Sequence, residues 1–155
     1  MGANASRVKA AMDVAANSTL RPDSDGAETA TATETAVPLG ILSAAYWDSN
    51  KEVPHGTIRV VVDVTAIDRT TGDETYTLTL QVDDTLAQSD TPQTVCTLGP
   101  LVSTGVYEML VDSKTINAIV TDYSGGELWM AIKATLGGTT PSITYAAWIA
   151  DSPVI

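Results

Sequence analysis

The chain has 155 residues, a formal net charge of −11 and 44% hydrophobic residues, but it has no phenylalanine and only 5% aromatic residues. This length suits one domain with a substantial core, and the composition favours strands of aliphatic residues over a large aromatic cofactor pocket. The acidic balance argues against nucleic acid as a partner, because phosphate binding needs clustered lysine and arginine.

No stretch of the sequence is apolar for long enough to cross a membrane as a helix, and the N-terminus lacks the apolar block of a secretory signal. The start MGANAS fits the short pattern for myristoylation, but only at positions that often match by chance. We therefore expect no membrane partner. The chain has one cysteine, Cys96, which cannot form an intrachain disulfide, so we expect a protein made in a reducing compartment.

The chain is interpreted as an arm, residues 1–25, followed by a β-sandwich domain, residues 26–155. The arm is rich in alanine, serine and asparagine, and it is expected to be extended or partly helical. Residues 1–22 carry a net charge of +2, against −13 for the rest of the chain. The basic residues responsible are Arg7, Lys9 and Arg21. We expect all three to pair with carboxylates of a partner subunit, which makes them candidate interface residues.

The first strand is predicted from Ala27 to Thr35, where threonine and alanine alternate. The stretch from Tyr46 to Gly56 is predicted to be a polar loop that holds Trp47 and the only histidine, His55. Long connections of this kind often carry contact residues, so Trp47 is a further candidate for the interface.

Two central stretches show the alternation of a strand, from Thr57 to Asp68 and from Thr75 to Val82. Val61 interrupts the polar side of the first stretch, which suggests that this strand is covered on both faces. The turn residues between them favour a hairpin of the two strands. Its expected inward residues are Ile58, Val60, Val62, Val64, Ala66, Tyr76, Leu78, Leu80 and Val82.

Three shorter strands are predicted from Thr94 to Leu98, from Val106 to Val111 and from Thr115 to Tyr123. With the remaining stretches they give about eight strands at regular spacing, with no convincing long helix beyond the arm. The sequence therefore predicts an all-β fold, a β-sandwich of the jelly-roll kind.

The C-terminal stretch from Glu127 to Asp151 is predicted to form two strands around a turn, Gly137 to Pro141, and these strands are expected to pair as a second hairpin. Trp129 and Trp148 fall on the parity opposite to the core residues of these strands. Either the second sheet of the sandwich covers them, or they anchor a partner subunit. They are candidate interface residues, and they favour a homo-oligomer.

The sequence offers few residues of the kinds that form common catalytic sites, because the chain has a single histidine and a single cysteine, Cys96. We expect no enzyme activity, no cofactor and no metal site. A weak calcium site is an alternative at either of two acidic turns, which supply oxygen ligands without the spacing of a calcium loop. The acidic residues of these turns are Asp68, Asp73, Glu74, Asp83 and Asp84.

Three stretches together resemble the small capsid cement, or decoration, proteins of tailed double-stranded DNA bacteriophages. They are TAVPLG from Thr35 to Gly40, TGDETYTLTLQVDD from Thr71 to Asp84, and LGGTTPSITYAAWI from Leu136 to Ile149. The resemblance implies a β-sandwich that oligomerises, commonly as a trimer, on the outer surface of the virion capsid. It implies the major capsid protein as partner and stabilisation of the shell as the role of this structural protein.

One alternative is a carbohydrate- or receptor-binding β-sandwich module of a phage virion. A groove lined by Trp47, Asp48 and Asn50 would favour this alternative. Binding of the isolated protein to glycans would distinguish it from the cement role. A small hydrolase is a third possibility, and it requires a pocket that unites His55 with carboxylates.

Overall fold

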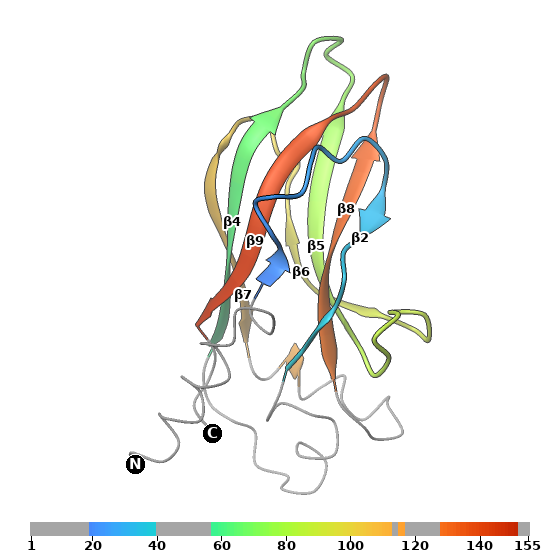
Figure 1. Ribbon diagram of the computed structural model, residues 1–155, viewed down its shortest axis with the longest axis vertical. Helices are drawn as coiled ribbons and strands as arrows, with labels where there is room; N and C mark the ends of the chain where they lie inside the picture. Colours follow the sequence, from blue (N-terminus) through green and yellow to red (C-terminus); the bar gives the residue numbers. More distant parts are fainter. Residues whose placement is uncertain (1–18, 40–56, 113–114, 117–127, 152–155) are drawn as a thin grey trace, which may run out of the picture.

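The computed structural model describes residues 19–39, 57–112, 115–116 and 128–151. In these ranges the chain forms two antiparallel sheets that pack face to face, so the predicted all-β sandwich is confirmed (Figure 1). The strands are β1 (Thr19–Arg21), β2 (Ala32–Thr33), β3 (Val37–Pro38), β4 (Thr57–Ile67), β5 (Thr75–Asp83), β6 (Gln93–Leu98), β7 (Gly105–Asp112), β8 (Trp129–Gly137) and β9 (Ile143–Asp151).

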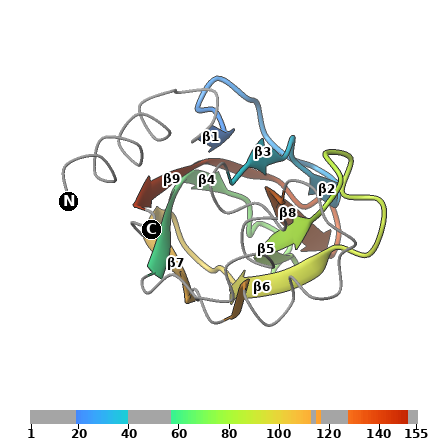
Figure 2. The same cartoon turned by 90° about the horizontal axis from the view of Figure 1, so that it is seen from below.

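The first sheet has the strand order β1-β9-β4-β7, and the second has the order β2-β8-β5-β6 with β3 also paired to β8. Because β2 and β3 both pair with β8, they occupy one strand position between them. The pairs are nested: β1 with β9, β2 and β3 with β8, β4 with β7, and β5 with β6. This is the connectivity of a jelly roll, and Figure 2 shows its two layers end-on.

Neither of the two expected hairpins forms. β4 lies in the first sheet and β5 in the second, and β8 and β9 are divided between the sheets in the same way. Each connection therefore crosses from one sheet to the other as an arch. We call residues 68–74 and 138–142 the arch turns. The strand alternation fits an arch as well as a hairpin, since it indicates which face of each strand is buried and not which strand lies beside it.

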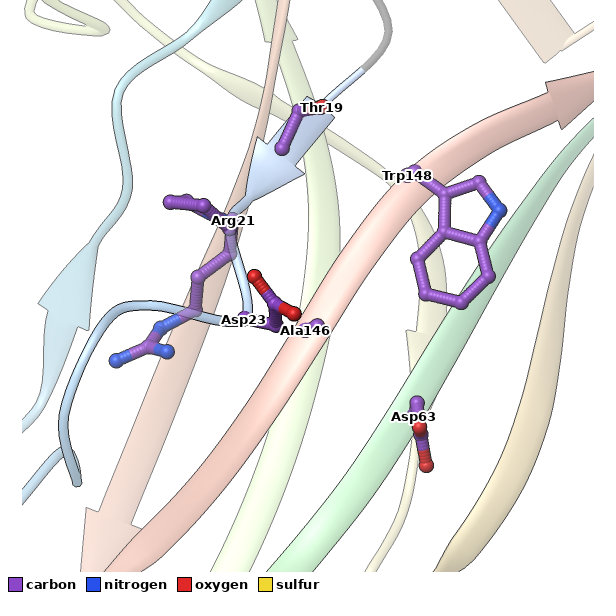
Figure 3. A pocket seen from close by; sticks show the side chains of 7 residues that line it. Thr19, Arg21, Asp23, Asp63, Ala146 and Trp148 are labelled. Atoms are coloured by element: carbon purple, nitrogen blue, oxygen red, sulfur yellow. The ribbon is translucent and has the colours of Figure 1, made fainter. Parts of the chain in front are cut away.

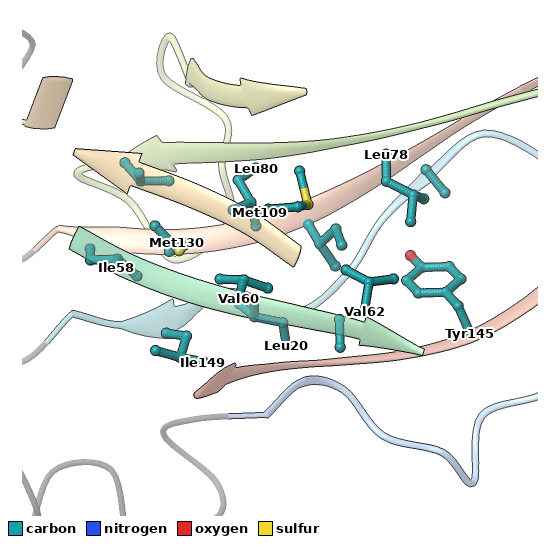
Figure 4. Close-up of a cluster of buried hydrophobic side chains, with 14 of the residues drawn as sticks. Leu20, Ile58, Val60, Val62, Leu78, Leu80, Met109, Met130, Tyr145 and Ile149 are labelled. Atoms are coloured by element: carbon teal, nitrogen blue, oxygen red, sulfur yellow. The ribbon is translucent and has the colours of Figure 1, made fainter. Parts of the chain in front are cut away.

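The core fills the space between the sheets with aliphatic and methionine side chains and with two tyrosines, Tyr76 and Tyr145. Figure 4 shows part of this cluster, with Tyr145 beside Val62. The alternation predicted these residues correctly for most of β4, β5, β8 and β9. Ala66 is an exception, because a shift of register between Val64 and Ala66 in the pairing of β4 with β9 turns it outward. The largest fully buried apolar side chains are Tyr76, Tyr145, Ile58, Leu78, Leu80, Met109, Ile116, Leu128 and Met130.

Two boundaries differ from those expected. The sandwich includes β1, so residues 19–25 belong to the domain and not to the arm. The strand expected from Thr115 to Tyr123 is contradicted at its start, where Thr115 and Ile116 are helical, and the rest of that stretch lies outside the described residues. Residues 1–18, the main part of the expected arm, also lie outside them.

Candidate interaction surface

The two outer faces of the sandwich differ in polarity. On the β2-β8-β5-β6 sheet, β5 and β8 present a largely polar row outward, with Thr75, Thr77, Thr79, Lys133 and Thr135. The described residues include five large hydrophobic side chains that are exposed. Three of these side chains, Val106, Leu110 and Trp148, lie on the outer face of the β1-β9-β4-β7 sheet. We call this face, with those three residues, the apolar face.

The pairing register places the residues of the apolar face in rows across the strands. Trp148 of β9 is paired with Val61 of β4, and Val61 is paired with Glu108 of β7. Val61 is buried although it points outward, so the expectation that both faces of this strand are covered is confirmed at this residue. Val106 is 69% exposed and Leu110 is 56% exposed on β7, which ends the sheet.

A hollow of about 390 Å³ opens beside Trp148. We call it the Trp148 hollow; its lining residues are Thr19, Arg21, Pro22, Asp23, Asp63, Ala146 and Trp148. Figure 3 shows the indole of Trp148 with Asp63 of β4 and with Asp23, which follows β1. Neither the Asp23 nor the Asp63 carboxylate forms a hydrogen bond or an ion pair within the described part of the chain.

Arg21, a candidate interface residue, is only 1% exposed and is bound by its own domain. Its Nε donates to Glu34 Oε1 at 2.8 Å, and its Nη2 donates to Glu28 Oε1 at 2.9 Å. Its Nη1 donates to the Tyr145 carbonyl at 2.8 Å, and its Cζ lies 4.6 Å from the centre of the Tyr145 ring. The guanidinium points away from Trp148 (Figure 3). Arg21 therefore holds β1 and residues 22–34 against β9, and its charge is not available to a partner.

The pKa values in this cluster follow from burial and charge together. Burial alone lowers the pKa of Arg21, but the hydrogen bonds to Glu28 and Glu34 outweigh it and leave the pKa above its ordinary value. Burial, with the nearby charge of Glu34, raises the pKa of Tyr145, whose hydroxyl donates to Glu34 Oε1 at 3.1 Å. Arg21 therefore stays charged and Tyr145 stays neutral across the physiological pH range, which is typical of a structural support.

Trp129 lies on the outer face of the other sheet. It is half-buried, and its cross-strand partners are Pro38 of β3 and Asp83 of β5. Its carbonyl accepts a hydrogen bond from Gln88 Nε2 at 3.2 Å. Trp129 and Trp148 share the outward parity that the sequence predicts, but they point to opposite sides of the molecule. The alternative in which the second sheet covers both of them is wrong, because that sheet packs on their inward neighbours.

In the arch turns, Asp73 binds the other turn, whereas Glu74 binds residues of its own turn. Asp73 accepts hydrogen bonds from Thr139 N at 3.1 Å and from Thr139 Oγ1 at 3.0 Å. Glu74 accepts from Gly72 N at 2.8 Å, from Thr71 N at 3.0 Å and from Thr71 Oγ1. The Thr139 amide is the main cause of the lowered pKa of Asp73, and the Thr71 hydroxyl is the main cause of the lowered pKa of Glu74. Two of the three stretches that carry the phage resemblance therefore meet in one hydrogen-bonded structure.

The second acidic turn leaves two buried oxygens unsatisfied, Asp84 Oδ1 and Gln88 Oε1. Burial, followed by the charges of Asp83 and Asp90, raises the pKa of Asp84. No group of three or more histidine, cysteine, aspartate or glutamate side chains in the described ranges has the arrangement of a metal site. Within the described residues, no helix is long and apolar enough to cross a membrane.

Three of the candidate residues, Arg7, Lys9 and Trp47, lie outside the described residues, as do His55, Asp48 and Asn50. Sequence reasoning missed Val106 and Leu110, although the run Val106-Tyr107 and the run Met109-Leu110-Val111 both break strict alternation and are a signal for apolar residues on both faces. It also missed Asp23 and Asp63, because nothing in the sequence places either of them beside Trp148.

A scan against models of known protein families gives no match for this chain. Searches of curated proteins and of solved structures give none either.

Proposed function

We propose that this protein is a capsid cement protein that binds the outside of a phage head across major capsid subunits and stabilises the shell. The observation that supports this most is the apolar face, where Trp148, Val106 and Leu110 remain exposed on one side of a sandwich whose other side is largely polar. Large hydrophobic side chains that stay exposed together on one face of a small protein are typical of a surface that binds another protein.

The mechanism requires binding free energy alone. A protein that bridges two or three subunits of an assembled shell, and binds separated subunits less well, adds its affinity to the cost of taking the shell apart. A trimer multiplies this effect, because three linked copies dissociate only when all of them release. We propose a homo-oligomer, most simply a trimer, whose copies each present an apolar face.

Binding to heads that were assembled without this protein tests the proposal. We expect the full chain to co-sediment with such heads and to raise the temperature at which they dissociate. The double variant Val106→Ser/Leu110→Ser should weaken binding at least about tenfold, because two apolar side chains in an interface are each worth about 1 kcal/mol or more. Absence of binding to the heads would contradict the proposal.

The chain offers a matched control for this experiment. Leu86 and Val102 are 54% and 64% exposed, close to the values for Leu110 and Val106, but they lie in connections outside the strands. The variant Leu86→Ser/Val102→Ser should bind heads as the wild type does. Equal losses in the two double variants would mean that general hydrophobicity, and not the apolar face, determines binding.

Oligomeric state is tested separately by sedimentation equilibrium. We expect a trimer at micromolar concentration, and a monomer at that concentration would remove oligomerisation from the mechanism. This result is independent of head binding, because a monomer can still bridge two shell subunits.

The carbohydrate-binding alternative is supported by one described feature, the exposed indole of Trp148 beside carboxylates in a hollow. Aromatic faces and carboxylate acceptors both occur in protein sites for polar ligands. Binding of the isolated protein to neutral glycans, lost in a Trp148 variant that still folds, would favour this alternative over the cement role.

A further inference from the structure

We propose that the Trp148 hollow is a binding site for a single arginine side chain presented by a partner polypeptide. Three properties of the hollow point to this ligand: its hydrogen-bonding capacity, its charge and its aromatic wall. The site is independent of the proposed cement role, because any protein that presents an exposed arginine in an accessible segment could fill it.

The hollow presents mainly hydrogen-bond acceptors. The carboxylates of Asp23 and Asp63 make no hydrogen bond within the described ranges. The donors of Arg21 are occupied by the Tyr145 carbonyl, the Gly26 carbonyl and two glutamates. A sugar hydroxyl both donates and accepts, whereas a guanidinium donates five N–H groups and accepts none. A hollow that offers acceptors matches a ligand that only donates.

The charge of the hollow points to the same ligand. Asp23 and Asp63 are both negative, and the positive charge of Arg21 is opposed by Glu28 and Glu34 in short ion pairs at 2.9 and 2.8 Å. Residues 23–155 as a whole carry a net charge of −13, which attracts cations to this surface. A neutral saccharide would gain nothing from this field.

The wall of the hollow completes the match. Trp148 of β9 is 38% exposed, while Ala146 and Pro22 add apolar surface. Tryptophan is the best aromatic partner for a cation, and a planar guanidinium can stack on an indole while its edge donates to a carboxylate. Lysine has the charge but not the plane, so it should bind more weakly.

The test is a titration of the ¹⁵N-labelled full chain with a short neutral peptide that contains one arginine, observed through the tryptophan indole N–H resonances. We expect the resonance of Trp148 to shift saturably. The resonance of Trp129, on the opposite outer face, should not move and serves as an internal control. A matched peptide with citrulline in place of arginine keeps the shape and removes the charge, and it should bind about tenfold more weakly.

Variants of the protein sharpen the assignment. Asp63→Asn keeps the shape of the side chain, so it should weaken the arginine peptide several-fold without changing the fold, and raised salt should have a similar effect. Equal binding of the arginine and citrulline peptides, or no shift of Trp148 up to about 10 mM peptide, would overturn the proposal. A saturable shift with neutral oligosaccharides that Asp63→Asn leaves unchanged would overturn it in favour of a saccharide site.

The remaining competitor is the basic arm of the chain itself, which carries Arg7 and Lys9 ahead of Thr19. The double variant Arg7→Gln/Lys9→Gln should bind the arginine peptide as the wild type does. Markedly tighter binding by this variant would show that the arm competes for the hollow, and it would overturn the assignment to a separate partner.

Discussion

The arch turns and the Trp148 hollow both contain acidic residues at the surface, but they use them in opposite ways. In the arch turns, Asp73 and Glu74 accept hydrogen bonds from backbone N–H groups and hydroxyls of the same molecule. In the hollow, Asp23 and Asp63 accept none within the described part of the chain. A structural carboxylate and an available one can therefore belong to the same residue type. They differ in the hydrogen-bond donors that surround them.

The largest effect is expected where the hollow meets its support, at Arg21. Arg21→Met should cost about 3–5 kcal/mol of unfolding free energy, because it leaves Glu28 and Glu34 without their buried cation. Urea unfolding measures this loss. The control is Arg59→Met, which breaks the exposed pair of Arg59 with Glu108 and should cost less than about 1 kcal/mol. Similar losses in both variants would contradict the structural role assigned to Arg21.

A smaller but still clear loss is expected from closing the space between the arch turns. Gly138 has a φ of +93°, and a Cβ at this position would lie 2.5 Å from the Asp73 carbonyl oxygen. Gly138→Ala should cost about 2–3 kcal/mol, since both the backbone conformation and a backbone contact oppose it. Gly26→Ala is the control, because a Cβ there meets nothing within 4 Å, and it should change the thermal midpoint little. Equal midpoints for the two variants would show that the turns adjust freely.

Acid should weaken the arch turns, because protonated carboxyl groups accept the hydrogen bonds of Asp73 and Glu74 less well. The pKa values of Asp73 and Glu74 are lowered in the folded protein, so their contribution to stability is present above the unfolded values of about 4. It is lost as the pH falls through the lowered values. Asp73→Asn should therefore flatten the fall of unfolding free energy below about pH 4, as measured by denaturant titrations at several pH values. An unchanged slope would mean that the Thr139 bonds contribute no net stability.

The smallest effect on stability is expected at the hollow. Asp63→Asn should change the unfolding free energy by less than about 0.5 kcal/mol, because the carboxylate has no described partner to lose. The same change at Asp73 removes an acceptor that Thr139 uses. Urea midpoints of the two asparagine variants compare the regions directly, and a larger loss at Asp63 than at Asp73 would reverse the distinction drawn between them.

The sequence predicts the buried faces of the strands well, and it predicts their partners poorly. Alternation over Thr75 to Val82 identifies the inward residues because side chains alternate regardless of the neighbouring strand. The turn residues between β4 and β5 suit an arch as well as a hairpin, so composition alone could not decide the pairing. The two outer faces could be predicted only in part, because Trp148 follows from parity while its companions on β7 depend on the register with β4.

The role of Arg21 could not be predicted at all. Its acidic partners lie 7 and 13 residues further along the chain, and Tyr145 lies 124 residues away. A lone arginine in a short polar stretch gives no sign that a strand and two glutamates will enclose it. The charge difference between the N-terminal stretch and the body is real, but this part of it is used inside the domain.

The nested pairing of the strands has a consequence for how the molecule folds. Bringing two segments together costs more entropy when more chain lies between them, so β5 and β6, joined across residues 84–92, are the most favourable pair to form first. β1 and β9 enclose almost the whole domain, with Thr19 paired to Trp148. Non-local pairings of this kind make folding slow. We expect β1 to dock among the last of the described strands, and the burial of Arg21 to wait until β9 has been synthesised.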